Sequence, residues 1–331
     1  MLGSDRHDIE RKQVIILRLV SESMEPLGAR VVAQRLEDYG IVLGERAVRY
    51  HLKLMDERGL TRLIGRDGRV ITEKGLEELD SALVGDKVGF VISKIELLAV
   101  QTTFDWRQRR GQLPVNVSFI PKAQFKRAWE EMRGAFDSGL CVSDLVTVAD
   151  EGERLAGSYV PQGKVGFASV CSLVVNGALL KAGIPMDSRF GGLLQIRDRQ
   201  PFRFVELIQY SGSSLDPSAI FITGRMTGVA RAVDKGDGKV LANFREIPAI
   251  CRPVAEEVFS GLRKAGIDGL LVMGDTSQPV CEIPVELNKI GVILLGGLNP
   301  VAAAVEAGIA IDNSAMSGVI DYEKLIRFST V

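Results

Sequence analysis

The segment 44–58 carries polar side chains at the spacing of one helix face: Arg46, Arg49, Tyr50 and Lys53. Positions i, i+3, i+4 and i+7 are neighbours on a helix. An apolar stripe lies on the opposite face: Val48, Leu52 and Met55. A helix in the major groove of DNA needs one apolar side held by its domain and one side of donors that reach bases or phosphates. The spacing therefore predicts a DNA recognition helix, in which His51 is a structural residue.

A basic hairpin is expected directly after this helix. Two β-prone runs flank Gly65-Arg66-Asp67-Gly68, and an Asp-Gly pair readily adopts the positive φ angles of a tight turn, so we place the turn at Asp67-Gly68. The hairpin would add three cations to the DNA-binding surface: Arg62, Arg66 and Arg69. The order helix, helix, basic helix, basic hairpin is typical of a winged helix-turn-helix. A module that binds only protein has the same order and remains the alternative.

Apolar periodicity and helix-ending residues predict the elements that position this surface. We expect helices over residues 8–20 and 29–39, the second with Val31, Val32 and Leu36 facing inward and ending at Gly40. A last helix is expected to be capped by Thr72 and to bury Leu76, Leu79 and Leu83. The pair Gly85-Asp86 marks the predicted boundary. Residues 1–84 are then a DNA-binding domain, and residues 85–331 an effector-sensing and dimerisation domain.

Four glycine-rich polar clusters interrupt the apolar segments of the larger domain, at residues 188–192, 210–217, 243–248 and 296–300. Glycine allows close backbone approach to a ligand, and exposed backbone N–H groups can hold an anion. Arg189 and Arg245 can each bind a carboxylate with two parallel hydrogen bonds. The sequence therefore predicts a site for a small anion, with these candidates: Arg189, Gly191, Gly192, Ser213, Ser214, Arg245 and Asn299. For any single cluster, turn formation alone is the alternative.

The same domain alternates strand-like runs with helical patterns. Residues 269–273 and 291–295 are strand-like, and three helical patterns end at Gly183, Gly266 and Gly308. This texture predicts an α/β fold, with α+β as the alternative. The sequence Lys-Val-Gly-Phe occurs at residues 87–90 and again at 164–167. Four residues do not decide whether the domain consists of two related halves, so that question stays open.

Composition narrows the class of protein. The chain has 331 residues with 41 Lys+Arg against 42 Asp+Glu, so any basic surface must be local. The 4 cysteines form no CxxC pair, which disfavours a metal site and fits free thiols in a reducing cytoplasm. No apolar run approaches the roughly 20 residues of a membrane span.

Catalytic signatures are missing from the sequence. Both histidines, His7 and His51, precede the larger domain, and no HExxH, GxSxG or P-loop spacing occurs. We therefore expect a protein that is not an enzyme and has no cofactor. An enzyme acting on a small anionic substrate is the runner-up, and a protein-interaction scaffold is the third possibility.

Several long motifs of the larger domain resemble one known family. They are CSLVVNG, KAGIP, SRFGG, SLDP, NFREIP and GLNP, beginning at residues 171, 181, 188, 214, 243 and 297. Over about residues 85–328, and in the winged helix before them, the chain resembles the archaeal-type global nitrogen repressors of the NrpR family. Many members carry two copies of the regulatory domain, and this chain has room for one.

The resemblance implies a homodimeric repressor of nitrogen-assimilation genes, including those for nitrogen fixation and glutamine synthetase. It also implies that 2-oxoglutarate, which accumulates when nitrogen is scarce, releases the repressor from its operator. A dimer agrees with physical reasoning, because one recognition helix covers few base pairs and a two-fold symmetric DNA site needs two copies.

Overall fold

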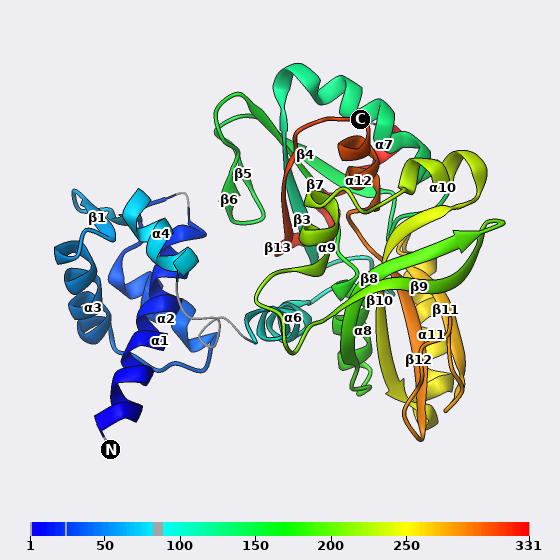
Figure 1. Ribbon diagram of the computed structural model, residues 1–331, viewed down its shortest axis with the longest axis horizontal. Coiled ribbons are helices and arrows are strands. Elements are labelled where there is room, and N and C mark those ends of the chain that lie inside the picture. The colour runs from blue at the N-terminus through cyan, green and yellow to red at the C-terminus, as the bar shows by residue number, and fades with distance from the viewer. Residues whose placement is uncertain (1, 24, 82–88, 331) are drawn as a thin grey trace. The chain divides into compact units, whose positions relative to one another are not determined.

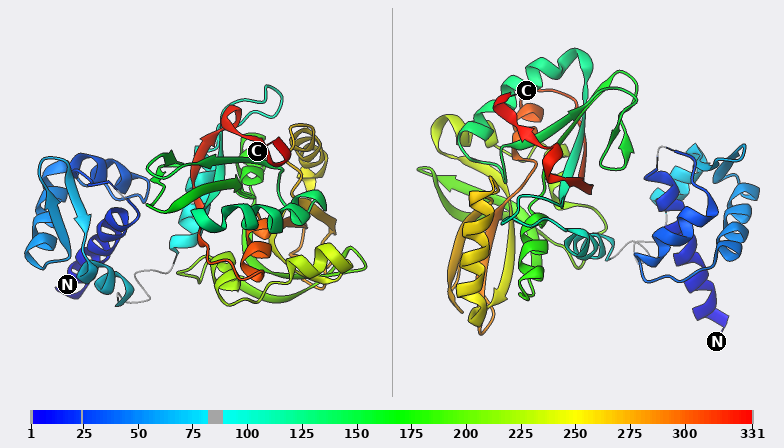
Figure 2. Two further views of the ribbon diagram at one scale, coloured as in Figure 1. Left: turned by 90° about the horizontal axis from the view of Figure 1, so that it is seen from above. Right: turned by 180° about the vertical axis from the view of Figure 1, so that it is seen from behind.

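The computed structural model describes residues 2–23, 25–81 and 89–330, and side chains within 12–23, 25–79 and 89–330. The chain divides into two compact units, Met1–Val88 and Gly89–Val331 (Figures 1 and 2). The predicted boundary at Gly85-Asp86 lies outside the described residues.

The first unit has the elements of a winged helix. Its helices are α1 (Leu2–Ser21), α2 (Ala29–Glu37), α3 (Glu45–Glu57) and α4 (Glu73–Ser81), and its hairpin is β1 (Thr61–Ile64) with β2 (Gly68–Ile71). Leu27 adds a short antiparallel bridge to Arg69 in β2. The core is the set of apolar residues that the helical periodicity selects, among them Ile16, Leu36, Val48 and Leu52.

Three predicted details of this unit are wrong. Val31 and Leu76 are 40% and 47% exposed, because they lie at the edges of their helices' apolar faces. The hairpin turns through Gly65, Arg66 and Asp67, with Ile64 paired to Gly68. Gly68 is required by a different contact: it has φ +138°, and a Cβ there would lie 2.3 Å from the carbonyl carbon of Leu27.

The last helix of this unit begins as predicted. The Thr72 hydroxyl accepts a hydrogen bond of 3.0 Å from the backbone N–H of Gly75, which is the capping contact expected of it. Leu83 lies outside the described residues.

Two five-stranded antiparallel sheets form the framework of the described part of the second unit, so the α+β alternative is observed. The first sheet runs β13 (Asp312–Asp321), β3 (Gln112–Pro121), β7 (Lys164–Val170), β4 (Leu145–Ala149), β14 (Ile326–Arg327). The second runs β11 (Leu270–Thr276), β12 (Lys289–Leu295), β10 (Gly238–Pro248), β8 (Asp187–Arg197), β9 (Gln200–Gln209). A small hairpin, β5 (Arg154–Leu155) with β6 (Ser158–Tyr159), lies apart from both sheets.

Helices connect and cover these sheets. They are α6 (Phe90–Gln101), α7 (Phe125–Asp137), α8 (Leu173–Lys181), α9 (Pro217–Thr223), α10 (Val229–Lys235), α11 (Arg252–Lys264) and α12 (Asn299–Glu306). Both α8 and α11 lie on the same face of the second sheet, as the front and back views show (Figures 1 and 2). The glycines after α8, α11 and α12 have φ angles of 78°, 82° and 87°, which confirms the predicted left-handed helix ends at Gly183, Gly266 and Gly308.

The described second unit is built from two related halves that exchange their last elements. Each half runs strand, short 3₁₀ turn, helix, strand, strand, helix, strand. The first half extends from β3 to β8, with the small hairpin β5–β6 inserted, and the second extends from β10 to β13. Strand β9 follows the first half and belongs to neither repeat. Strand β8 ends the first half but pairs with β10, and β13 ends the second half but pairs with β3. Helices α8 and α12 likewise pack against α11 and α7 of the opposite half. The halves are therefore interlocked and form one compact unit.

A repeated ion pair marks the same duplication. Lys164 pairs with Asp312 across the first sheet, and Lys289 pairs with Asp187 at 3.2 Å at the equivalent place in the second. The repeat of residues 164–167 is thus Lys-Ile-Gly-Val at 289–292, which begins β12. The similarity to residues 87–90 has no such basis: Gly89 and Phe90 begin helix α6, and Lys87 and Val88 lie outside the described residues.

Candidate functional site

Helix α3 presents its polar face to solvent. Arg46 is exposed, the side chains of Arg49 and Lys53 are 66% and 72% exposed, and Tyr50 is 62% exposed. The opposite face, with Val48 and Leu52, is fully buried against the unit's core. The structure therefore brings the four predicted residues of this helix together on one accessible surface.

The cations of this face have weak partners of their own. Arg49 pairs with Glu45, and Lys53 lies 3.7 Å from Glu57, each one helical turn away. Such exposed pairs are worth little because water screens them. A phosphate or a base edge can replace the carboxylate at small cost.

The wing divides its three arginines between two roles. Arg62 and Arg66 are exposed. The Arg69 side chain is only 13% exposed, and its Nε donates a hydrogen bond of 2.7 Å to Oδ2 of Asp56 at the end of α3. The Thr61 hydroxyl donates to the other oxygen of Asp56 at 2.6 Å. Arg69 is therefore placed to hold the hairpin against α3, and its assignment to the DNA-contacting set stays a prediction.

Exchanging Arg66 and Arg69 for alanine in turn should give opposite results. Arg66→Ala should weaken binding to all duplex sequences, lower the salt dependence and leave the melting temperature unchanged. Arg69→Ala should leave Asp56 with the Thr61 hydroxyl but without its ion-pair partner, and lower the free energy of unfolding by about 1–2 kcal/mol. Thermal melts and salt titrations of both variants test this. If the Arg69→Ala variant is stable and its DNA binding depends less on salt, Arg69 contacts DNA and is not needed to hold the hairpin.

The second unit contains a buried arginine without a neutralising carboxylate. Arg245, on β10, is 1% exposed. Its Nη1 donates to the Ser188 hydroxyl at 3.3 Å, its Nη2 donates to the Ser172 hydroxyl at 3.3 Å, and its Nε has no partner. Within the described residues, no carboxylate lies within ion-pair distance of it. Burial lowers the pKa of this guanidinium, since desolvation penalises the charged form. A buried charge without an ion-pair partner is costly, which makes Arg245 a candidate anion-binding residue.

Two crossing connections position this arginine. Between β7 and α8 the chain crosses at Cys171 and Ser172, and between β12 and α12 it crosses at Gly296 and Gly297. The two crossings touch: a Cβ on Gly297 would lie 2.4 Å from the carbonyl oxygen of Val170. The helices α8 and α12 therefore begin at one place, and helix N-termini favour negative charge.

A small cavity lies at this crossing. Its volume is about 20 Å³, and it is lined by residues of both halves that include Asn116, Cys171, Ser172, Tyr210, Asp216, Asn243, Arg245 and Gly297. Oδ1 of Asp216 accepts hydrogen bonds from the backbone N–H groups of Ser218 and Ala219, and burial raises the pKa of this carboxyl. The Tyr210 hydroxyl donates to Oδ1 of Asn243, whose Nδ2 donates to the Ser172 hydroxyl at 3.2 Å. Burial raises the pKa of Tyr210 well above its ordinary value, so its hydroxyl stays protonated as a donor.

A larger groove of about 570 Å³ adjoins the cavity, between α6, α8 and the start of β8. Ser188 and Met186 line the groove, and both also contact the Arg245 guanidinium. Asn176 lines it as well, with a buried side-chain oxygen that has no partner. Ile95 of α6 lines both spaces, so this helix covers the cavity and one side of the groove.

Only one half carries this arginine. The register of β8 with β10 pairs Ser188 with Arg245, and that of β13 with β3 pairs Asn313 with Ser118. The equivalent contact in the first half is a neutral hydrogen bond of 2.8 Å from Ser118 to Asn313. In the described part of the second unit, a buried arginine therefore stands at this position in the second half but not in the first.

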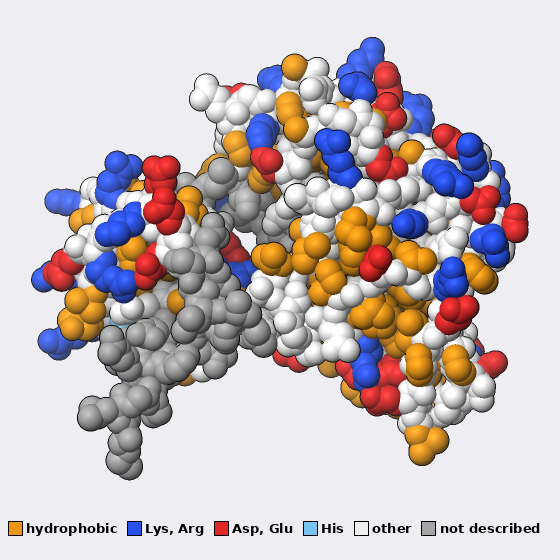
Figure 3. All heavy atoms as spheres, in the orientation of Figure 1, with side chains coloured by type: hydrophobic (Ala, Val, Ile, Leu, Met, Phe, Trp, Pro, Cys, Tyr) orange, Lys and Arg blue, Asp and Glu red, His pale blue; other side chains and the backbone are white. Residues whose placement is uncertain are grey.

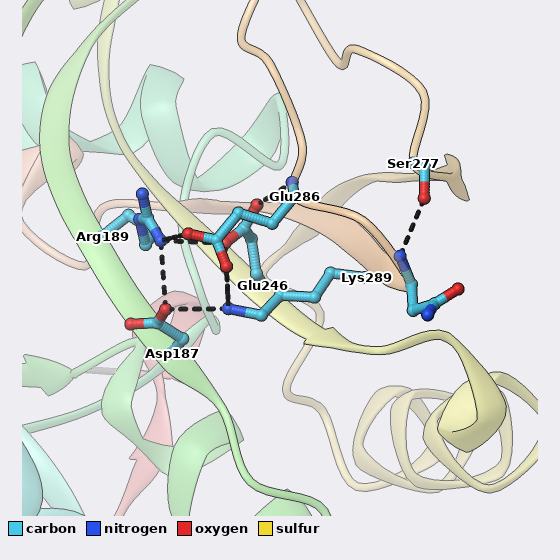
Figure 4. A network of polar contacts seen from close by, with 7 residues as sticks. Asp187, Arg189, Glu246, Ser277, Glu286 and Lys289 are labelled. Carbon is cyan, nitrogen blue, oxygen red and sulfur yellow. Dashed lines mark hydrogen bonds and ion pairs between the residues drawn. The ribbon is translucent and has the colours of Figure 1, made fainter.

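Arg189 is in a different environment from Arg245. Its Nη1 lies 3.2 Å from the buried carboxylate of Glu246 and 3.3 Å from Asp187, and it also pairs with Glu286 (Figure 4). Lys289 closes this network from the other side, at 2.6 Å from Glu286. Both cations hold the pKa of the Glu286 carboxyl down at about 2. Arg189 borders the groove, but its charge is already neutralised.

The other predicted effector residues support the fold near the cavity and do not line it. A Cβ on Gly191 would lie 3.0 Å from the Tyr210 hydroxyl, and one on Gly192 would lie 2.5 Å from the Glu206 carbonyl oxygen. Ser213 bonds within its own turn, to Leu215, and Ser214 is half-buried beside it. The side-chain amide of Asn299 is bonded to the backbone of Leu241: its Oδ1 accepts from the Leu241 N–H at 2.7 Å, and its Nδ2 donates to the Leu241 carbonyl at 3.0 Å.

Five further residues at or beside the cavity were not predicted as site residues, although they lie within the sequence motifs that were singled out. Ser188, Tyr210 and Asn243 belong to three of the glycine-rich clusters, and Ser172 and Asn176 belong to the CSLVVNG motif. Their residue types gave no signal, because serine and asparagine are common in turns.

Within the described residues, no helix has the length and apolar character that crossing a bilayer requires. No group of three or more His, Cys, Asp or Glu side chains in the same part of the chain is placed to hold a metal ion.

Comparison with known proteins agrees with this architecture. A family model described as NrpR regulatory domains NRD1 and 2 matches residues 88–327, and a model of the ribonuclease R winged-helix domain matches residues 14–79. A global nitrogen regulator NrpRI of Methanosarcina mazei is 40% identical over 317 residues, which is 96% of this chain and 98% of the relative. A global nitrogen regulator NrpR of Methanocaldococcus jannaschii is 34% identical over 319 residues, and there the chain spans 55% of the relative's length.

One solved structure resembles the larger unit. The crystal structure of a nitrogen repressor-like protein from Methanococcus jannaschii matches 73% of this chain and 99% of its own, with a TM-score of 0.62 and 26% identity.

The winged helix and the attached regulatory unit define a transcription regulator, and the relatives are named as regulators, not as enzymes. The chain belongs to the NrpR family.

Proposed function

We propose that this protein represses nitrogen-assimilation genes by binding a two-fold symmetric operator as a homodimer, and that 2-oxoglutarate releases it. The names of its relatives support the nitrogen-related role. The single observation that carries the effector site is Arg245, a buried guanidinium with unneutralised charge at the crossing of the two halves.

A dicarboxylate suits the groups around Arg245. One carboxylate can accept hydrogen bonds from the guanidinium, from the Ser172 and Ser188 hydroxyls, and from backbone N–H groups where α8 and α12 begin. The adjoining groove, at about 570 Å³, falls in the range of small-molecule sites and has space for the remainder of the ligand. The unpaired Asn176 oxygen prefers a donor, so a ligand with only acceptors must meet it through a bridging water.

The closed cavity gives binding a mechanical consequence. A cavity of about 20 Å³ holds about one water molecule, so a carboxylate enters only if a covering element moves. Helix α6 is such an element: Val91, Ile95 and Leu98 pack against Leu173 and Tyr210 at the cavity. In the sequence, α6 follows directly on residues 82–88, which join it to the winged helix. We infer that the ligand moves α6 and thereby changes the spacing of the two recognition helices.

Ligand binding switches the protein only if the ligand distinguishes two arrangements of the dimer. Linkage then requires operator DNA to weaken ligand binding by the same factor by which ligand weakens DNA binding.

Calorimetry tests the coupling directly. 2-Oxoglutarate is titrated into the free protein and into its operator complex, with glutarate, which lacks the keto oxygen, as the control ligand. We expect binding to the complex to be about 5–150-fold weaker than to the free protein. Equal affinities in the two titrations would refute the coupling, and the absence of binding in both would refute the effector.

A further inference from the structure

Seven exposed cations gather at one end of the second sheet. They come from the β8–β9 hairpin, the loop before α10, helix α10 and the start of β10: Arg197, Arg199, Arg203, Arg225, Arg231, Lys235 and Lys239. We call this set the basic rim. Residues 197–203 and 225–239, which contain all seven cations, hold three acidic residues, Asp198, Asp234 and Asp237, so these two stretches have an excess of four positive charges on a chain with net charge −1. Figure 1 places α10 and the β8–β9 hairpin at the right of the view, and at the right of Figure 3 several blue side chains lie among red ones.

Contacts between the segments make the rim one surface. The Arg199 backbone N–H donates to the Gly236 carbonyl at 2.9 Å, which joins the hairpin to the end of α10. In the sheet, Arg203 and Lys239 are the register partners of Gln195 on its two sides. Side chains of register partners point to the same face, so these two cations lie on one face of the sheet, two strands apart.

Within the described residues the cations of the rim make contacts but no ion pairs; Arg203, for example, donates a hydrogen bond of 3.4 Å from Nε to Oε1 of Gln195. None of the seven lies within ion-pair distance of a carboxylate in residues 89–330. Elsewhere on the same unit, exposed cations such as Arg107, Arg263 and Arg327 are paired with acidic residues. Unpaired like charges repel one another, so the rim carries an uncompensated positive potential that an anionic partner would neutralise.

Two of these arginines occupy a backbone conformation that disfavours them. Asp198 and Arg199 form the two-residue turn between the paired residues Arg197 and Gln200, with φ angles of 50° and 61°. Asn-Gly is the usual choice for such a turn. Arg225 also has a positive φ, of 51°. Arginine in this conformation is strained, and such strain gathers at positions with a functional role.

Phe202 holds two more arginines in place. Its ring is 37% exposed, and the guanidinium groups of Arg197 and Arg203 lie 5.0 and 5.3 Å from its centroid. Cation–π contact limits the motion of both side chains without neutralising their charge. A partner therefore meets arginines that are already partly ordered, which lowers the entropic cost of binding.

We propose that the basic rim binds the phosphate backbone of duplex DNA, as a contact separate from α3 and the wing. Five of its seven cations are arginine, whose planar guanidinium binds phosphate with two hydrogen bonds. Of the two glutamines beside these cations, Gln195 already accepts a hydrogen bond from Arg203, so the rim offers mainly charge and contributes affinity more than sequence preference. The proposal rests on the proposed function only in that the chain acts on DNA.

A triple variant of the full chain tests the rim: Arg199→Gly, Arg203→Gln and Lys239→Gln. Glycine relieves the positive φ at position 199, so the variant should fold, which its melting temperature will check. The matched control is Arg107→Gln, Arg263→Gln and Arg327→Gln, which removes the same charge from exposed cations of the same unit. Affinity for a mixed-sequence duplex is measured against salt concentration. The logarithm of the binding constant is plotted against the logarithm of the salt concentration. We expect the magnitude of the slope to decrease by about 0.9 for each phosphate that the rim variant no longer neutralises, and the slope of the control to stay unchanged.

Each result has a distinct meaning. A rim variant that keeps the wild-type slope, or a control whose slope falls as much, would overturn the proposal. Poly-glutamate of matched charge that competes as well as the duplex would assign the rim to an acidic protein partner and would overturn it too. If the protein binds its operator specifically and the rim variant binds DNA like the wild type, the rim proposal is refuted and the proposed function is not. Rim-dependent duplex binding without any operator preference refutes the proposed function and leaves the rim in place.

Discussion

Arg245→Met is expected to abolish the response to 2-oxoglutarate while leaving the protein at least as stable as the wild type. In the described structure the guanidinium has serine hydroxyls and a methionine sulfur as side-chain hydrogen-bond partners, and its Nε has none. Replacing a buried charge by an apolar side chain of similar length is commonly neutral or stabilising. Removing the partner of a buried carboxylate costs about 2–5 kcal/mol of binding, which is roughly 30-fold to several thousandfold in the dissociation constant.

Arg189→Met is the matched control, and it should behave in the opposite way. Glu246 is 1% exposed and would keep Lys289, at 3.5 Å, as its remaining ion-pair partner. We therefore expect a decrease of about 1–3 kcal/mol in the free energy of unfolding with 2-oxoglutarate binding retained. Chemical denaturation and calorimetry on both variants give the two readouts. If Arg245→Met binds the ligand normally and Arg189→Met does not, the site belongs at Arg189.

The double variant Arg46→Ala and Arg49→Ala should lose nearly all preference for the operator. Each arginine that reads a base edge contributes about 1–3 kcal/mol, and the proposed homodimer presents both residues twice. Because both side chains are exposed, their removal should not change the melting temperature. Binding is measured by gel shift on operator and on mixed-sequence duplex, so that specific and nonspecific affinity are separated.

Lys74→Ala provides the charge control in the same unit. Lys74 lies on α4 and donates to the Arg58 carbonyl at 2.8 Å, so its removal takes away one cation outside the proposed surface.

The wild type should bind an operator with two half-sites far more tightly than one with a single half-site. Equal binding to the two duplexes would argue against a dimer, and an unaffected double variant would remove α3 from the interface.

The winged helix was largely predictable because its signals are local. The α3 stripe of Val48, Leu52 and Met55 needs only the 3.6-residue period to be recognised, and burial follows it closely. The hairpin turn was predicted wrongly for a non-local reason. Gly68 avoids a clash with Leu27, a residue far away in the chain, and the Asp-Gly pair offers no sign of that contact.

The duplication illustrates the same limit. The two halves share a fold and an ion pair, but few identical residues. The repeat visible in the sequence, residues 87–90 and 164–167, is not part of the duplication, because Phe90 begins a helix and Lys164 begins a strand. The exchange of α8 and β8 for α12 and β13 depends on which strand edges meet, and strand pairing is decided by long-range contacts.

By itself, the sequence determined the class of protein, the exposed polar face of α3 and the helix ends at Gly183, Gly266 and Gly308, and it selected two arginines as candidates for binding a carboxylate. It could not rank Arg189 against Arg245, because both are arginines beside glycines and polar residues. Only the tertiary structure separates them. It brings Asp187, Glu246 and Glu286 around Arg189, and leaves Arg245 among serines at the crossing of two connections. Charge neutralisation and desolvation depend on neighbours within a few ångströms, and those neighbours come from strands distant in the chain.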